Sequence, residues 1–172
     1  MKIRPLLLLA ASTLTFASPV LAGQPPIPNP LIDYAAFEKI VDTADNERES
    51  RRLTEDAFLA MMNQKAVVVL DARSPAMYKL RHIKGAVSLP FTDFTAAALA
   101  DVLPEKEVQI LIYCNNNFLG SPFAFASKMP AASLNLSTYT SLKAYGYDHI
   151  FELGPLLDVG KTKIPFAGSE VK

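Results

Sequence analysis

The residues AVVVLDARSP at positions 66–75 decide the fold of this chain of 172 residues. Residues 66–70 form an unbroken apolar run, which is typical of a strand in a parallel sheet that is covered on both faces. Ser74 can cap a helix, and Pro75 suits the first helical position. A buried strand that leads into a helix through a short polar turn indicates an α/β protein.

The rest of the chain continues this alternation of strands and helices. Further strands are predicted at residues 86–89, 109–113 and 149–153. Helices are predicted at residues 33–44, 55–63, 75–79, 94–103 and 137–145, with Thr54 as the cap of the second. The polar run 45–52 is interpreted as a linker. We therefore expect a single α/β domain with a central parallel sheet and helices on both faces.

The first 22 residues have the pattern of a secretory signal peptide. Lys2 and Arg4 precede a mostly apolar run, and small residues precede a cleavage site after Ala22. The run is short for a membrane span, so an uncleaved N-terminal anchor is the less favoured alternative. We expect export to a bacterial periplasm in soluble form, without a stable membrane anchor. Residues 23–52 are then a proline-rich leader with an N-terminal helix, and residues 53–172 a domain with a C-terminal tail.

Composition and charge exclude several classes of function. The chain has 17 basic and 17 acidic residues, and removal of Lys2 and Arg4 would leave a slight acidic excess. Such a chain has no basic stripe for nucleic acid, so no nucleic-acid partner is expected. A single cysteine excludes an internal disulfide and a cysteine-built zinc site. Two distant histidines disfavour other metal sites, and we expect no metal.

Cys114 is the strongest candidate for a reactive residue. It directly follows the predicted strand 109–113, and ligands of open parallel sheets bind at the carboxyl ends of the strands. A polar loop comes next, and Ser121 with Pro122 is predicted to start a helix. Loop N–H groups and the N-terminus of that helix would favour a thiolate and a negatively charged sulfur. The alternative is a buried, inert cysteine.

Two segments resemble the signature of the rhodanese family. The first is LDARS at residues 70–74, and the second is HIKGAVSLP at residues 82–90, with Tyr78 between them. The resemblance extends over residues 53–154 and implies a rhodanese-like α/β fold. It also implies that Cys114 is the nucleophile that forms a persulfide, and that no metal or organic cofactor is required.

Three residues of this signature have two interpretations each. Asp71 and Arg73 form either a structural pair at a strand end or part of a substrate site, and the structural pair is favoured. His82 either orients the turn through hydrogen bonds or acts as a general base, and the first role is favoured.

The loop after Cys114 departs from active rhodaneses, which usually carry glycine and often a cation there. The loop residues are Asn115, Asn116, Asn117, Phe118, Leu119, Gly120 and Ser121. Because none is basic, thiosulfate should bind weakly unless Arg73, Lys84 or Lys128 reaches the site. Phe118 and Leu119 should place apolar surface beside the sulfur, which suits an organic persulfide or a protein-bound thiol.

Two functions remain open. The first is an exported sulfurtransferase or sulfur carrier in which Cys114 takes sulfur from a donor and passes it to a thiol acceptor, such as a periplasmic protein. The second is a catalytically weak module that binds a periplasmic protein partner. The cation-free loop favours the second, and the cysteine at the strand end favours the first. The stretch 129–135 is interpreted as an insertion that forms a lid or a partner surface.

Overall fold

The computed structural model describes residues 27–171, and the predicted signal peptide lies outside them. The chain divides into a unit that ends at Ile32 and a compact unit that begins at Asp33. In the described part of the first unit, the Asn29 side chain accepts a hydrogen bond from the Leu31 amide at 3.0 Å. Within residues 27–171, no helix is long and apolar enough to cross a membrane.

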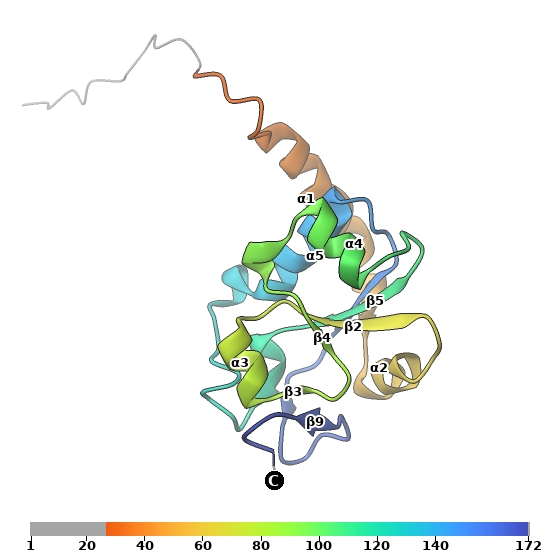
Figure 1. Ribbon diagram of the computed structural model, residues 1–172, viewed down its shortest axis with the longest axis vertical. Coiled ribbons are helices and arrows are strands. Elements are labelled where there is room, and N and C mark those ends of the chain that lie inside the picture. The colour runs from red at the N-terminus through yellow and green to blue at the C-terminus, as the bar shows by residue number, and fades with distance from the viewer. Residues whose placement is uncertain (1–26, 172) are drawn as a thin grey trace, which may run out of the picture. The chain divides into compact units, whose positions relative to one another are not determined.

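A sheet of five parallel strands forms the centre of the compact unit (Figure 1). In spatial order the strands are β1 (Arg52–Leu53), β7 (Ile150–Leu153), β5 (Gln109–Tyr113), β2 (Val67–Asp71) and β4 (Val87–Ser88). The middle strand, β5, pairs with β2 along its whole length. Because the strands are parallel, the carboxyl ends of β2, β5 and β7 meet at one edge of the sheet.

Helices cover both faces of this sheet (Figure 1). They are α1 (Tyr34–Arg51), α2 (Glu55–Met62), α3 (Pro75–Leu80), α4 (Ala96–Val102) and α5 (Leu134–Ala144), with 3₁₀ turns η1 (Phe91–Asp93), η2 (Asn115–Asn117) and η3 (Pro130–Ala132). In β5, Leu111 belongs to a core with Phe58 of α2, and Ile112 to a second core with Leu142 of α5. Burial on both faces explains why β5 is apolar throughout. The predicted fold class is confirmed.

The helix starts predicted from capping residues are confirmed. Thr54 Oγ1 accepts a hydrogen bond from the Ala57 amide at 3.3 Å, and Ser74 Oγ accepts one from the Met77 amide at 3.4 Å. Pro75 lies in the first turn of α3, where its missing N–H is not needed. The strand predicted at residues 109–113 has those bounds, and the other predicted strands differ by one residue at their ends.

The N-terminal helix is longer than predicted. In the polar run 45–52, which was interpreted as a linker, residues 45–51 continue α1 to its end and Arg52 begins β1. Glu47 accepts a hydrogen bond from the Tyr139 hydroxyl at 2.9 Å and forms an ion pair with Lys143 at 3.0 Å, both on α5. The polarity of this run therefore reflects partners within the domain. As a result, α1 belongs to the compact unit that begins at Asp33 rather than to a leader outside the domain.

The helix predicted to start at Ser121 and Pro122 does not form. The Phe125 amide donates to the Ser121 carbonyl at 2.8 Å, which closes one turn, and residues 126–128 do not continue it. The Ser121 hydroxyl donates instead to the Glu170 carboxylate at 2.6 Å. A residue near the end of the chain thus uses the predicted cap, which the local pattern could not reveal.

The C-terminal tail pairs with two loops of the domain. β8 (Leu157–Asp158) runs parallel to β6 (Phe118–Leu119), and β9 (Phe166–Ala167) runs antiparallel to β3 (His82–Ile83). At Gly168 the angle φ is +123°, and a Cβ there would lie 2.5 Å from the Leu80 carbonyl oxygen. Only glycine can make this close approach, which holds the tail against the end of α3.

Candidate functional site

Cys114 directly follows β5 at the carboxyl edge of the sheet, and only 1% of its surface is exposed. Its Sγ lies 3.4 Å from the Asn116 amide nitrogen and 3.4 Å from Ser133 Oγ. The Asn117 amide donates to the Cys114 carbonyl at 3.2 Å and also faces the sulfur, in a capping box in which Cys114 caps η2. The backbone donors at the sulfur are therefore the amides of Asn116 and Asn117, both in η2. The expected helix N-terminus is missing from the described chain, because no helix starts at Ser121.

The asparagines after Cys114 use their side chains to fix the loop. Asn117 Oδ1 accepts a hydrogen bond from the Cys114 amide at 2.8 Å, and its Nδ2 donates to the Leu153 carbonyl at 2.7 Å. Asn116 exchanges hydrogen bonds with the two backbone groups of Lys128, at 2.8 and 2.9 Å. These contacts tie the loop to the end of β7 and to the segment before η3, which fixes the position of the sulfur.

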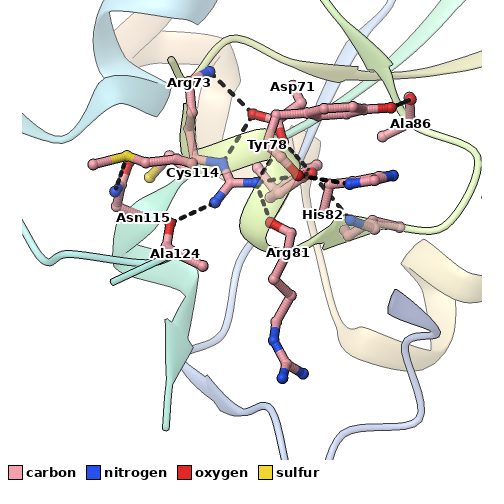
Figure 2. A network of polar contacts seen from close by, with 12 residues as sticks. Asp71, Arg73, Tyr78, Arg81, His82, Ala86, Cys114, Asn115 and Ala124 are labelled. Atoms are coloured by element: carbon pink, nitrogen blue, oxygen red, sulfur yellow. Dashed lines mark hydrogen bonds and ion pairs between the residues drawn. The ribbon is translucent and has the colours of Figure 1, made fainter. Parts of the chain in front are cut away.

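Asp71 and Arg73 form a closed network at the end of β2 (Figure 2). Both side chains are fully buried, and Arg73 Nε donates to Asp71 Oδ1 at 2.9 Å. Arg73 Nη1 and Nη2 donate to the carbonyls of Ala124 and Arg81, each at 2.8 Å. Burial raises the pKa of Tyr113 well above its ordinary value, and its hydroxyl donates to Asp71. Every guanidinium nitrogen of Arg73 thus has a protein partner, and the pair joins three loops of the fold.

His82 is part of a turn held by Tyr78 (Figure 2). Its Nδ1 lies 2.8 Å from the Tyr78 carbonyl oxygen, and the two rings stack with centroids 3.8 Å apart. The Tyr78 hydroxyl donates to the Ala86 carbonyl at 2.7 Å, which closes the turn between α3 and β4. These contacts orient the turn, and they engage Nδ1 of the His82 ring.

A pocket of about 310 Å³ opens over Cys114, and we call it the Cys114 pocket. It lies among the loop, the start of α5, the ends of α1 and β7, and β1. Its lining consists of Arg48, Arg52, Cys114, Asn116, Asn117, Pro130, Ser133, Asn135, Leu136, Glu152, Leu153 and Gly154. Among the described residues, Asp71, Arg73 and His82 do not contribute to this lining. Within the same range, no group of three His, Cys, Asp or Glu side chains is placed to hold a metal.

Two arginines and one carboxylate set the charge of the Cys114 pocket. Arg48 Nη2 lies 2.7 Å from Glu152 Oε1 and donates to Oε2 at 3.0 Å. Arg52 Nε lies 3.4 Å from the same Oε1. Glu152 is 1% exposed, and burial raises its pKa above the ordinary value, although Arg48 and Arg52 oppose the rise. Within the lining two arginines face one carboxylate, and Arg52 also forms an ion pair with Glu49, outside the lining, at 3.1 Å.

The residues that give the pocket its charge were not identified from the sequence. Arg48 and Arg52 fell in the supposed linker, whereas Lys84, Lys128 and Arg73 were considered as sources of charge outside the loop. Glu152 offered a usable signal, because a lone acid in the apolar strand Ile150–Leu153 requires a buried partner.

The stretch 129–135, which was interpreted as an insertion, is ordered against the loop that follows Cys114. It contains η3 and the first residues of α5, which starts three residues before the predicted helix. Ser133 places its hydroxyl against the sulfur of Cys114, and Asn135 donates to Asn117 Oδ1 at 3.2 Å. The stretch therefore forms one wall of the Cys114 pocket.

Phe118 and Leu119 do not place apolar surface beside the sulfur. The Phe118 ring is 1% exposed and packs against the rings of Tyr113, Phe125 and Phe166. Leu119 is 50% exposed and lines a different hollow, together with the residues that follow it. The expectation that these two side chains select an organic donor is therefore wrong, because β6 turns away from Cys114 to pair with β8.

Several known proteins are similar to this chain in sequence or in structure. The Rhodanese-like domain family matches residues 54–153. The thiosulfate sulfurtransferase PspE of Escherichia coli (strain K12) is 24% identical over 95 residues, which cover 55% of this chain and 76% of that protein. A rhodanese with anions from E. coli has a TM-score of 0.41 at 21% identity, over 60% of this chain and 99% of that chain. An EanB variant in complex with hercynine has a TM-score of 0.46 at 23% identity, over 60% of this chain and 24% of that chain.

Two features define the class of protein to which this chain belongs. They are a parallel α/β domain and a cysteine at the carboxyl end of its central strand. Within that class, the chain belongs to the rhodanese-like family, because the family matches more than half of its length. The resemblance seen at residues 70–90 is confirmed. The family and the similarity to PspE support sulfur transfer as the general function.

Proposed function

We propose that this chain is an exported sulfurtransferase or sulfur carrier in which Cys114 carries sulfane sulfur as a persulfide. The observation that carries the proposal is the position of Cys114 at the end of β5, in a pocket that Arg48 and Arg52 also line. Guanidinium groups bind anionic donors and stabilise negative charge on sulfur. Because Arg48 of α1 and Arg52 of β1 supply positive charge that the loop lacks, the uncharged loop is no longer by itself a reason to expect weak thiosulfate binding.

The transfer consists of two half-reactions at one sulfur atom. The Cys114 thiolate attacks the outer sulfur of a donor, and the rest of the donor leaves with the electron pair of the broken bond. An acceptor thiolate then attacks the outer sulfur of the Cys114 persulfide, which restores the cysteine. The Asn116 amide is placed to donate to the charged sulfur, and no metal or organic cofactor takes part in either step.

Mass spectrometry tests this function directly. The chain is incubated separately with thiosulfate and with sodium polysulfide, and its intact mass and the peptide that contains Cys114 are measured. We expect a gain of one sulfur atom on that peptide, reversed by a thiol reductant and abolished in the Cys114→Ser chain. No gain with either donor would remove the proposal.

A second candidate function is the module that binds a protein partner. The burial of Cys114 and the contact of its sulfur with Ser133 Oγ favour it, because a persulfide needs room and hydrogen-bond donors. The same incubations separate the two functions, since a binding module gains no sulfur. Replacement of Ser133 by alanine refines the test, because it removes the covering hydroxyl and should speed sulfur uptake only if Cys114 is a sulfur carrier.

Export rests on the pattern of residues 1–22, which lie outside the described residues. We expect the chain in the periplasmic fraction of expressing cells, with Gly23 as its first residue. Intact mass and N-terminal sequencing of the fractionated protein measure both properties. A chain that keeps Met1 and sediments with membranes would contradict export in soluble form.

A further inference from the structure

The Cys114 pocket contains buried polar atoms that have no partner in the described chain. Within residues 27–171, Arg48 Nε and Asn135 Oδ1 form no hydrogen bond, and Asn135 as a whole is 4% exposed. Glu152 Oε1, by contrast, is occupied, because it lies 2.7 Å from Arg48 Nη2 and 3.4 Å from Arg52 Nε. Because buried polar groups are nearly always satisfied, unsatisfied polar atoms in a pocket indicate a place for a ligand.

The hydrogen-bond network fixes which atom of the Asn135 amide is free. Asn117 Oδ1 must face the Cys114 amide, which can only donate, and its Nδ2 must face the Leu153 carbonyl, which can only accept. Asn135 can approach Asn117 Oδ1 only with its own Nδ2, at 3.2 Å. Asn135 Oδ1 is therefore a hydrogen-bond acceptor for which residues 27–171 provide no donor.

Free donors and free acceptors lie together in this pocket. Arg48 offers its free Nε, and Arg52 offers positive charge, although its Nη1 and Nη2 already donate to Glu49 and to the Gly154 carbonyl. Asn135 Oδ1 is the free acceptor, and Glu152 supplies negative charge. A simple dianion would satisfy the arginines but would face the Glu152 carboxylate and leave Asn135 Oδ1 unpaired. A ligand with an ammonium group and a carboxylate group would satisfy both sides.

We infer that the Cys114 pocket takes a small zwitterionic amino-acid thiol, as the free thiol and as its persulfide. The carboxylate of the ligand pairs with Arg48 and Arg52, and its ammonium group donates to Asn135 Oδ1 and Glu152. A volume of about 310 Å³ suits a molecule of this size. This inference rests on the function proposed above for Cys114, and it names the class of donor and acceptor.

The sulfur transfer balances without an added oxidant or reductant. The Cys114 thiolate attacks the outer sulfur of the amino-acid persulfide, and a new S–S bond forms on Cys114. The S–S bond of the ligand breaks, and its electron pair leaves on the sulfur of the amino-acid thiolate. The reverse reaction makes the free amino-acid thiol the acceptor, so one binding mode serves both directions.

Calorimetric binding to the full Cys114→Ser chain tests the inference without any sulfur chemistry. The ligands are L-cysteine, 3-mercaptopropionate, which lacks the ammonium group, and cysteamine, which lacks the carboxylate. We expect L-cysteine to bind about tenfold or more tightly than either, because each of the others loses a charge-assisted contact. Equal binding of 3-mercaptopropionate or of cysteamine would overturn the inference, and so would the absence of binding by all three.

Two variants assign the charged contacts to residues. In the Glu152→Gln chain the preference for L-cysteine over 3-mercaptopropionate should fall, and in the Arg52→Gln chain the preference over cysteamine should fall. Arg51→Gln is the matched control, because Arg51 directly precedes Arg52, lies outside the pocket lining and has its guanidinium over the Phe151 ring at 5.1 Å. A purely structural role would weaken all three ligands alike, leave both preferences unchanged and contradict the inference.

A second measurement covers the case in which a variant fails to fold. The melting temperature of the unmodified chain is measured in reductant with each ligand, and L-cysteine should raise it most. The two proposals then fail in different ways. Sulfur uptake on Cys114 without a preference for L-cysteine rejects this inference alone, whereas no uptake from any donor rejects the proposed function.

Discussion

Two arginine–carboxylate clusters lie at the same edge of the sheet, and they differ in how fully they are satisfied. Around Asp71, the Arg73 side chain is completely buried, and all its nitrogens donate to protein oxygens. Around Glu152, the side chains of Arg48 and Arg52 are 29% and 39% exposed, and Arg48 Nε has no partner within residues 27–171. The closed cluster has no capacity left for a ligand, whereas the open cluster has.

The two clusters contain the same types of residue. The difference in how fully their hydrogen bonds are satisfied therefore separates a structural role from a binding role. Arginine beside a buried acid is often interpreted as part of an active site, and both clusters would qualify on that ground. Only the cluster at Glu152 shares a pocket with Cys114. The count of unsatisfied donors and acceptors, rather than the presence of charge, therefore indicates where a substrate binds.

The largest expected effect is on stability, at the closed cluster. Arg73→Met leaves Asp71 buried without its cation and frees two carbonyl groups, so we expect a loss of about 3–5 kcal/mol in the free energy of unfolding. Urea unfolding at neutral pH measures it. Arg48→Met is the matched change at the open cluster, and it should cost clearly less, because Glu152 keeps Arg52 and its own cluster reaches solvent. Equal losses in the two chains would show that the clusters do not differ as described.

The next effect is on the chemistry of Cys114, at the open cluster. Iodoacetate and iodoacetamide alkylate the same sulfur and differ in charge, so the ratio of their rates measures attraction of an anion to the pocket. We expect Arg52→Gln and Arg48→Gln each to lower this ratio about tenfold, the value of one charge-assisted contact. The rates are followed by mass spectrometry of the Cys114 peptide.

The control for this comparison is again Arg51→Gln, which removes an arginine from α1 outside the pocket lining. Its rate ratio should equal that of the unmodified chain. If all three variants lower the ratio alike, the general charge of α1 and β1 is responsible, and the open cluster has no special role.

The sequence was sufficient for features that depend on neighbours in the chain. The apolar strand at residues 109–113 and the caps Thr54 and Ser74 involve contacts within a few positions, and each was predicted. The position of Cys114 directly after β5 was predicted for the same reason, because it too is a local feature. Asp71 and Arg73 are two residues apart, so their pairing was among the interpretations considered.

The open cluster could not be predicted, because its members are far apart in the chain. Arg48 and Glu152 are separated by 104 positions, and only the packing of α1 near β7 brings them together. The same reason explains the wrong helix at Ser121, whose hydroxyl pairs with Glu170, 49 positions away. Polar residues without a local partner were interpreted as part of a linker or as a cap, although their partners lay across the fold.

A smaller effect is expected in the pH dependence of stability. Burial raises the pKa of Glu152 above its ordinary value of 4.5, so the folded chain holds this proton more tightly than the unfolded chain. The stability that this preference contributes is complete below the ordinary pKa and is lost as the pH rises through the raised one. The free energy of unfolding, relative to the Glu152→Gln chain, should therefore fall as the pH rises through that window.

Urea unfolding of the two chains over a series of pH values measures this difference. The other titratable groups are common to both chains, so their contributions to the pH dependence cancel in the difference. Asp148, for example, has a pKa lowered by Lys143, and it contributes equally on each side of the comparison. A difference that rises with pH would mean that the arginines outweigh burial, and that the cluster at Glu152 is closed after all.

The smallest effect on the alkylation rates of Cys114 is expected when a cation is added to the loop that follows Cys114. Leu119 lies on β6, half-exposed, in a hollow that does not include Cys114. Leu119→Arg should therefore change the ratio of iodoacetate to iodoacetamide rates by less than about twofold, the range of ordinary surface substitutions. A sharper version of this experiment introduces Leu119→Arg into the Arg52→Gln chain. If the loop were the natural place for the cation, the added arginine would restore the lost ratio. We expect no restoration, because β6 turns toward β8 and away from the sulfur, and a restored ratio would move the anion site from the open cluster to the loop.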